Sequence, residues 1–262
     1  MTTDFESLLA KWDSIFLNTV DPTRERRMEA IVGVLGTHFH GPIRVLDLGT
    51  GPGPLAGRIL KRFRGSRVIA VDSDPVLLRV GEQALSRYGS RITWVLADLR
   101  EKDWSSGFPT ESCDAAVSSL ALHWLEEREI RILYRNLRRL LRPEGFLVNG
   151  DFLPSHRAKR GIRGEGAESD GDRRAEKVDA SVRAFKPKWE RWWGAIEKDP
   201  SMRAALRERQ IRMPGPLPPR RNSGPEIPVP LEAHERGLRD AGFRETAVIW
   251  RDQGFRVLVG TK

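Results

Sequence analysis

The sequence has almost no cysteine and no segment suited to crossing a membrane. Cys113 is the one cysteine in 262 residues, which excludes an internal disulfide framework and a metal site built from several thiolates. No run of about 18 apolar residues occurs. The N-terminus also lacks a basic segment followed by an apolar stretch, the pattern typical of a signal peptide. We therefore expect a cytoplasmic protein with no membrane partner and no metal site.

Acidic residues are fewer than basic ones, and the imbalance is local. The net charge is +9, and residues 152–230 supply +7 of it with 18 Lys and Arg against 11 Asp and Glu. Such a segment either binds nucleic acid or forms a solvated, arginine-rich surface. We favour the solvated surface, because the excess lies outside the part of the chain that carries the nucleotide-binding pattern described below.

Predicted strands and helices alternate along much of the chain. The predicted strands are 43–48, 67–71, 92–97, 113–118, 146–149, 245–251 and 255–260. The predicted helices among these strands are 55–63, 75–88, 127–141 and 231–241. The β-α-β order predicts a mostly parallel sheet covered on both faces. The last two strands are separated by Asp252-Gln253-Gly254, which predicts an antiparallel C-terminal hairpin. The expected fold is α/β: a Rossmann-like, doubly wound, seven-stranded sheet.

We divide the chain into three parts. Residues 1–40 carry two amphipathic helices, 4–17 and 23–35, which we expect to cover the ligand site. Residues 41–151 and 231–262 form the sheet domain. The insertion after the fifth strand, 152–230, is expected to form a substrate lid. Its predicted parts are a mobile loop at 155–180, a helix at 188–198 that opens after Pro187, a basic helix at 201–212 and a proline-rich stretch at 214–230.

A glycine turn follows the first strand in the segment Val45-Leu46-Asp47-Leu48-Gly49-Thr50-Gly51-Pro52-Gly53. Glycine permits positive φ and close approach of a ligand, and the helix behind the turn offers free N–H groups. Asp72 and Asp98 end the next two strands, and such strand ends meet at the ligand-binding edge of an open α/β sheet. The alternative role for these aspartates is helix capping, for which Asp74 before Pro75 is better placed.

In this context the motifs resemble those of class I S-adenosylmethionine-dependent methyltransferases of the small-molecule type. The resemblance covers about 40–150 and 231–262, through the segments 45–53, Val71-Asp72, Ala97-Asp98-Leu99, 113–124 and 141–147. It implies S-adenosylmethionine as cofactor. The glycine turn would hold the methionine part, and Asp47 would orient that turn or meet the methionine ammonium. Asp72 would bind the ribose and Asp98 the adenine amino group. The implied cofactor-binding residues are Asp47, Gly49, Thr50, Gly51, Gly53, Asp72, Ser73, Asp98, Leu99 and Ser118.

The segment from Ser118 to Trp124 follows the fourth strand, where this family places the transferable methyl group. It is similar to the corresponding segment of small-molecule and carboxyl methyltransferases. An imidazole titrates near neutral pH, so His123 is the candidate catalytic base. The alternative is that His123 and Trp124 only pack against the cofactor or cap the next helix. The expected substrate residues are His123, Trp124 and Trp192, while Trp189 and Trp193 are expected to pack the insertion onto the sheet domain.

The sequence therefore predicts an enzyme that transfers a methyl group by an SN2 step from S-adenosylmethionine to a small molecule. Two alternatives stay open. One is an RNA-directed methyltransferase that uses the basic insertion. The other is a binding module that kept the cofactor pocket but not catalysis. The acceptor and the oligomeric state are not predicted.

Overall fold

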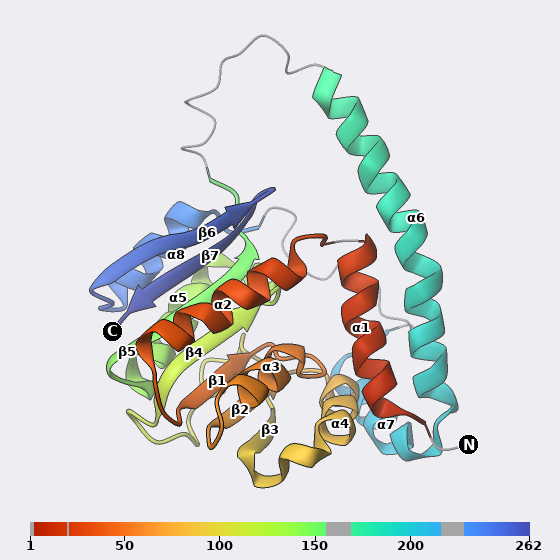
Figure 1. Cartoon of the computed structure of the whole chain (residues 1–262), viewed down its shortest axis with the longest axis horizontal. Helices are drawn as coiled ribbons and strands as arrows, with labels where there is room; N and C mark the ends of the chain where they lie inside the picture. Colours follow the sequence, from red (N-terminus) through yellow and green to blue (C-terminus); the bar gives the residue numbers. More distant parts are fainter. Residues whose placement is uncertain (1–2, 20, 156–168, 216–227) are drawn as a thin grey trace.

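The computed structural model describes residues 3–19, 21–155, 169–215 and 228–262 (Figure 1). Within these residues, a seven-stranded sheet runs in the order β3-β2-β1-β4-β5-β7-β6. The strands are β1 Arg44–Leu48, β2 Arg67–Asp72, β3 Ile92–Leu96, β4 Cys113–Ser119, β5 Leu141–Phe152, β6 Glu245–Asp252 and β7 Phe255–Thr261. The first five strands pair in parallel, and β7 pairs antiparallel with both β5 and β6. The predicted sheet and its closing hairpin are confirmed.

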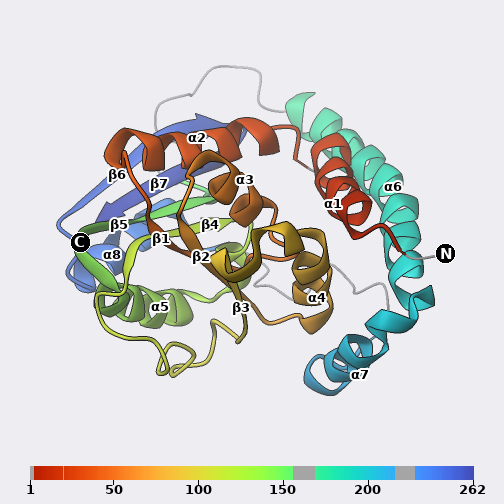
Figure 2. The same ribbon diagram turned by 60° about the horizontal axis from the view of Figure 1, so that its bottom comes forward.

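Helices cover both faces of the sheet (Figures 1 and 2). On one face lie α2 Arg24–His38, α3 Pro54–Arg62 and α4 Pro75–Ala84, and on the other lie α5 Glu127–Leu140 and α8 Leu231–Asp240. Successive side chains of a strand point to opposite faces of the sheet, so the strands contribute to two hydrophobic cores. Val45 packs with the α2 and α3 side chains, and Leu46 packs with those of α5. The helix predicted at 75–88 is shorter than expected, because α4 ends at Ala84 and a 3-10 helix, Ser86–Arg91, follows.

The start of β5 differs from the prediction. The strand begins at Leu141 rather than at residue 146, and its pairing with β4 shifts register between Cys113 and Ala115. Glu144 has a φ of 63° in the extra segment. A Cβ on Gly145 would lie 2.9 Å from two backbone oxygens, so this position favours glycine. Residues 143–145, which lie between the predicted helix and the predicted strand, are therefore an irregularity inside β5. The far end of the strand still reaches the ligand-binding edge.

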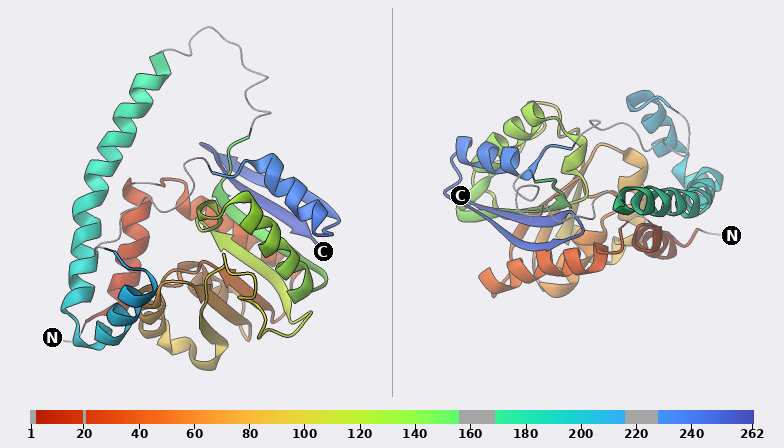
Figure 3. Two further views of the ribbon diagram at one scale, coloured as in Figure 1. Left: turned by 180° about the vertical axis from the view of Figure 1, so that it is seen from behind. Right: turned by 90° about the horizontal axis from the view of Figure 1, so that it is seen from above.

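The N-terminal helix α1 Phe5–Thr19 lies along the insertion helix α6 Ser169–Lys198 (Figures 1 and 3). The predicted loop at 155–180 is wrong from residue 169 onward, and the helix does not open at Pro187 but runs through it. Packing explains the passage through Pro187, since Phe185 and Trp189, on either side of it, contact Phe16 of α1 with ring centroids 5.7 and 6.1 Å away. Proline costs one helical hydrogen bond, and aromatic contacts on both sides offset that loss.

The rest of the insertion agrees with the prediction where it is described. A short 3-10 helix, η4 Pro200–Met202, leads into the basic helix α7 Arg203–Arg212. Residues 156–168 and 216–227, which include parts of the predicted loop and of the proline-rich stretch, lie outside the described residues. No helix in the described part of the chain is both long and apolar enough to cross a bilayer.

Candidate functional site

The glycine turn adopts the positive φ angles that its glycines permit. Gly49, Gly51 and Gly53 have φ values of 62°, 56° and 83°. A Cβ on Gly49 would lie 2.3 Å from the Cβ of Ala121 in the loop after β4, and one on Gly53 would lie 2.7 Å from the Trp94 ring. Any side chain at these two positions would both strain the backbone and clash. The turn therefore forms a bare backbone surface between β1 and α3.

Two acidic side chains, Asp47 and Asp72, face this turn. Asp47 is 1% exposed and accepts a hydrogen bond of 2.6 Å from the Thr50 hydroxyl. Burial raises the pKa of Asp47 to about 7. Asp72 accepts N–H bonds from Gly51 at 2.7 Å and Asp74 at 2.9 Å. Burial raises the pKa of Asp72 to about 6. Among the described residues, neither carboxylate is bonded to a cationic side chain, so the site suits a positively charged ligand.

A pocket of about 70 Å³ lies over the turn, with α1 as its outer wall. Its lining residues are Trp12, Phe16, Arg24, Met28, Asp47, Gly49, Thr50, Gly51, Pro54, Leu55, Ser119 and Leu120. The Trp12 ring is only 3.7 Å from where a Cβ of Gly51 would stand. Ligand pockets usually hold roughly 300–1,000 Å³, so with α1 in this position the pocket is too small for a ligand of that size. We expect the helix at 4–17 to cover the ligand site, and the structure adds that Trp12 and Phe16 of this helix and Arg24 of α2 line the pocket.

In the described part of the chain Asp98, unlike Asp47 and Asp72, forms an ion pair with a neighbouring side chain, Arg100. Both of its carboxylate oxygens accept hydrogen bonds from Arg100, at 2.9 and 3.0 Å from Nε and at 2.6 Å from Nη2. Partial burial opposes ionisation, but these bonds outweigh it and lower the pKa of Asp98. An adenine amino group that binds here would share this carboxylate with the Arg100 guanidinium.

Three further predicted cofactor residues have different surroundings. Ser118 is buried, and its hydroxyl donates to the Leu48 carbonyl at 3.0 Å, so it ties β4 to β1. Leu99 packs in the core beneath α5. Ser73 is half-buried between Asp72 and Asp74. Of the predicted set, the structure brings Asp47, Asp72 and the glycine turn together most closely.

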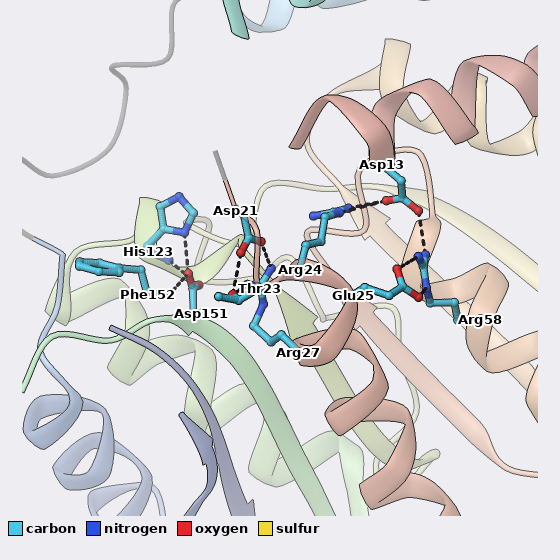
Figure 4. A network of polar contacts seen from close by, with 10 residues as sticks. All are labelled: Asp13, Asp21, Thr23, Arg24, Glu25, Arg27, Arg58, His123, Asp151 and Phe152. Carbon is cyan, nitrogen blue, oxygen red and sulfur yellow. Dashed lines mark hydrogen bonds and ion pairs between the residues drawn. The ribbon is translucent and has the colours of Figure 1, made fainter. Parts of the chain in front are cut away.

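His123 lies in a short 3-10 helix, Leu122–Trp124, after β4, and it is held by Asp151 of β5 (Figure 4). Its Nδ1 is 2.7 Å from one Asp151 oxygen, and its backbone N–H donates to the other at 3.1 Å. Burial disfavours the Asp151 charge, but His123, the Phe152 N–H and the nearby Arg27 cation together lower the pKa of Asp151. An ionised Asp151 keeps the proton on Nδ1 and leaves Nε2 as a proton acceptor.

Sequence reasoning did not include Asp151, because 28 residues separate it from His123 and only the β4–β5 pairing brings them together. Trp124 follows His123 and is 37% exposed, with its ring 4.8 Å from the imidazole. These two rings thus form an open aromatic and basic surface beside the strand ends.

The predicted substrate residue Trp192 lies between α6 and α1. It is 2% exposed, its indole N–H donates to the Leu8 carbonyl at 2.9 Å, and its ring is 5.0 Å from Trp12. Trp193 is fully buried, and Arg209 of α7 stacks over it at 5.3 Å. Trp192 therefore supports Trp12 from behind.

A buried ion pair anchors the insertion to the start of α4, just after β2. Arg209 of α7 bonds Asp74, the N-cap of α4, at 2.7 Å, and both side chains are less than a tenth exposed. Asp74 also accepts from the Val76 N–H at 2.9 Å, as the sequence predicted for a helix cap. Asp74 is two residues after Asp72 in the sequence, so this ion pair holds α7 close to the end of β2.

Known proteins share this arrangement in part. A family model described as a methyltransferase domain matches residues 45–145, which include the glycine turn, Asp72, Asp98 and His123. Trans-aconitate 2-methyltransferase of Azoarcus sp. (strain BH72) is 36% identical over 121 residues, covering 44% of this chain and 43% of that protein. Malonyl-[acyl-carrier protein] O-methyltransferase of Halorhodospira halophila (strain DSM 244 / SL1) is 34% identical over 119 residues, covering 43% and 36%. The chain thus spans less than half the length of these relatives.

A solved structure extends the likeness beyond the matched segment. The 1,6-didemethyltoxoflavin-N1-methyltransferase of Burkholderia thailandensis, with 1,6-didemethyltoxoflavin and S-adenosylhomocysteine bound, superposes with a TM-score of 0.53 at 17% identity. The superposition covers 98% of this chain and 88% of that one. At this identity the likeness concerns the fold.

Proposed function

We propose that the chain, whose residues 45–145 match a methyltransferase domain, belongs to the class I S-adenosylmethionine-dependent methyltransferases and methylates a small molecule whose nucleophile must lose a proton. The donor is S-adenosylmethionine, which when bound supplies a methyl group on a positively charged sulfur. The observation that carries the proposal is the His123–Asp151 pair, in which Asp151 bonds Nδ1 and no described residue hydrogen-bonds the imidazole Nε2.

The chain's own residues suit this donor. In this proposal the backbone of the Gly49–Gly53 turn would hold the amino-acid end, and the buried Asp47 carboxylate would receive its ammonium. Asp72 would bind the ribose hydroxyls. Because burial holds the pKa values of both aspartates well above 3.8, a cationic ligand relieves an electrostatic cost that the folded protein already bears. This match is stronger than one from glycine spacing alone.

On the acceptor side, Asp151 orients the imidazole of His123 and stabilises the imidazolium that forms when Nε2 takes a proton. A hydroxyl, an N–H or an acidic C–H becomes a nucleophile in this way, while a carboxylate acceptor is already ionised and needs alignment only. The exposed Trp124 ring offers a flat apolar surface for such an acceptor. Methyl transfer would then follow an in-line SN2 course.

Cofactor binding is tested first by calorimetry with S-adenosylhomocysteine. We expect saturable binding that Asp72→Ala weakens, because Asp72 bonds the Gly51 N–H of the glycine turn. Asp103→Ala, a change at an exposed aspartate with no such bond among the described residues, should leave binding intact. Binding that is absent, or that is unchanged in Asp72→Ala, would refute use of this site.

The acceptor class is tested by methyl transfer to a panel of phenols, enolisable carbonyl compounds and carboxylates, followed by mass spectrometry. Activity on the first two groups should fall by about 100-fold or more in His123→Ala, the range typical of a lost general base. Activity confined to carboxylates, or equal activity of wild type and variant on phenols, would contradict the proposed role of His123.

A further inference from the structure

Arg24 places a guanidinium in the same pocket as the Asp47 carboxylate. It is the first residue of α2, it is 5% exposed, and it lines the pocket together with Asp47, Gly49 and Thr50. The pocket over the glycine turn therefore holds one anionic and one cationic side chain. A zwitterion, with an ammonium and a carboxylate on one carbon, has the charges that match this pair.

The carboxylate that Arg24 binds in this structure comes from α1. Arg24 donates to one oxygen of Asp13 from Nε at 3.0 Å and from Nη2 at 2.8 Å (Figure 4). The other Asp13 oxygen accepts from Arg58 of α3 at 2.8 Å, and Arg58 in turn bonds Glu25 at 2.6 Å. One carboxylate thus connects α1 to both α2 and α3.

These contacts make the Arg24–Asp13 pair dependent on the position of α1. Burial lowers the pKa of Arg24 and the Asp13 charge opposes this effect, so the guanidinium relies on its carboxylate partner. Asp13 is one residue from Trp12, which covers the turn at 3.7 Å from the Gly51 position. A shift of α1 that admits a ligand also withdraws the Asp13 carboxylate from Arg24. The buried cation then needs another anion.

We propose that Arg24 binds the carboxylate at the amino-acid end of S-adenosylmethionine, which replaces Asp13, while Asp47 receives the ammonium of the same group. The exchange is one ion pair for another, with no covalent change. The inference rests on the proposed use of this donor, and it assigns the donor's carboxylate to a residue outside the glycine turn. It also links cofactor binding to the position of α1, because the cofactor and α1 compete for one guanidinium.

The test compares two ligands that differ in this one group. Calorimetry measures binding of S-adenosylmethionine and of decarboxylated S-adenosylmethionine, which lacks the carboxylate. Wild type should bind the complete cofactor about 10- to 100-fold more tightly, the range for a charged hydrogen-bonded pair. In Arg24→Gln this preference should fall below about threefold, because neither ligand then finds a cation.

Two control variants separate ligand binding from helix anchoring. Asp13→Asn removes the competing carboxylate and should keep or increase the preference for the complete cofactor. Arg58→Gln breaks the other Asp13 contact and should leave the preference unchanged, since Arg58 does not line this pocket. If Arg24 only anchored α1, all three variants would weaken both ligands alike, and the proposal would be overturned.

Two further outcomes are informative. If Arg24→Gln does not fold, Arg24→Lys is the substitute, because it keeps the charge but not the two-pronged geometry. Its preference for the complete cofactor over the decarboxylated one should be weaker than that of wild type but still present. An unchanged preference in Arg24→Lys would refute the paired contact. Absence of binding of either ligand to wild type would instead refute the cofactor assignment itself, a result separable from a lost carboxylate preference.

Discussion

Replacing Asp47 with asparagine should stabilise the ligand-free protein at pH 8 and have little effect at about pH 5. The folded protein holds Asp47 at a pKa of about 7 against 3.8 in the unfolded chain, because burial disfavours its charge. Between these values the folded state binds more protons than the unfolded state, so unfolding free energy falls as the pH rises. The loss is complete above the folded pKa. Asparagine has no charge to bury.

The size of the effect follows from the shift. About three pKa units correspond to about 4 kcal/mol at neutral pH and above. Asparagine keeps an acceptor for the Thr50 hydroxyl but weakens the remaining contacts of the carboxylate, at a cost of about 1 kcal/mol. The expected gain is therefore about 3 kcal/mol at pH 8. Near pH 5 the wild-type penalty is only about 1–2 kcal/mol, which the lost contacts nearly cancel.

Urea unfolding followed by tryptophan fluorescence at several pH values between 5 and 8 measures this difference. Asp103→Asn, at an exposed position, is the matched control and should run parallel to wild type. The same Asp47→Asn protein should bind S-adenosylhomocysteine more weakly, since the ammonium loses its carboxylate. Stability curves of wild type and Asp47→Asn that stay parallel from pH 5 to 8 would refute the raised pKa and with it the electrostatic argument for a cationic ligand.

Three other changes have defined outcomes. Gly49→Ala should cost at least about 1–2 kcal/mol in urea unfolding and abolish the cofactor-induced rise in Tm, because of its φ of 62° and the 2.3 Å clash, whereas Gly107→Ala has free space and should be neutral. Asp151→Asn should lower kcat by about 100-fold with acceptor KM nearly unchanged, since it disturbs only the proton acceptor; a KM effect of the same size argues against this role. Arg209→Met should cost about 3 kcal/mol by leaving buried Asp74 unpaired, and α7 amides should exchange faster with deuterium; full protection of α7 would show that the pair does not anchor it.

Much of the sheet could be predicted because its signals are local. Apolar runs such as Ile43 to Leu48, bounded by Gly41-Pro42 and the glycine turn, mark a buried strand without knowledge of its neighbours. The same holds for the closing hairpin around Gly254. The passage of α6 through Pro187 was beyond such reasoning, because proline is a local helix breaker and only packing against α1 outweighs it.

The site residues also differ in whether local sequence signals could predict them. The turn and Asp72 were predictable because strand ends and glycines occur within one β-α-β unit. Asp151 and Arg24 were not, since their roles depend on which elements meet in space. The spacing of aromatic residues in α1 shows which side of the helix is apolar, but not that this side covers a glycine turn. Trp192 illustrates the converse, as its helix position is equally suited to lining a pocket and to supporting Trp12.

The position of β7 has a consequence for folding. It lies between β5 and β6, and Phe146 pairs with Thr261 across the whole insertion and α8. During synthesis β5 emerges long before its partner, so one side of it stays an unpaired edge in the meantime. Closing so long a loop is slow compared with forming local β-α-β units. We therefore expect the C-terminal hairpin to dock last, and intermediates that lack it to be the species most prone to aggregate.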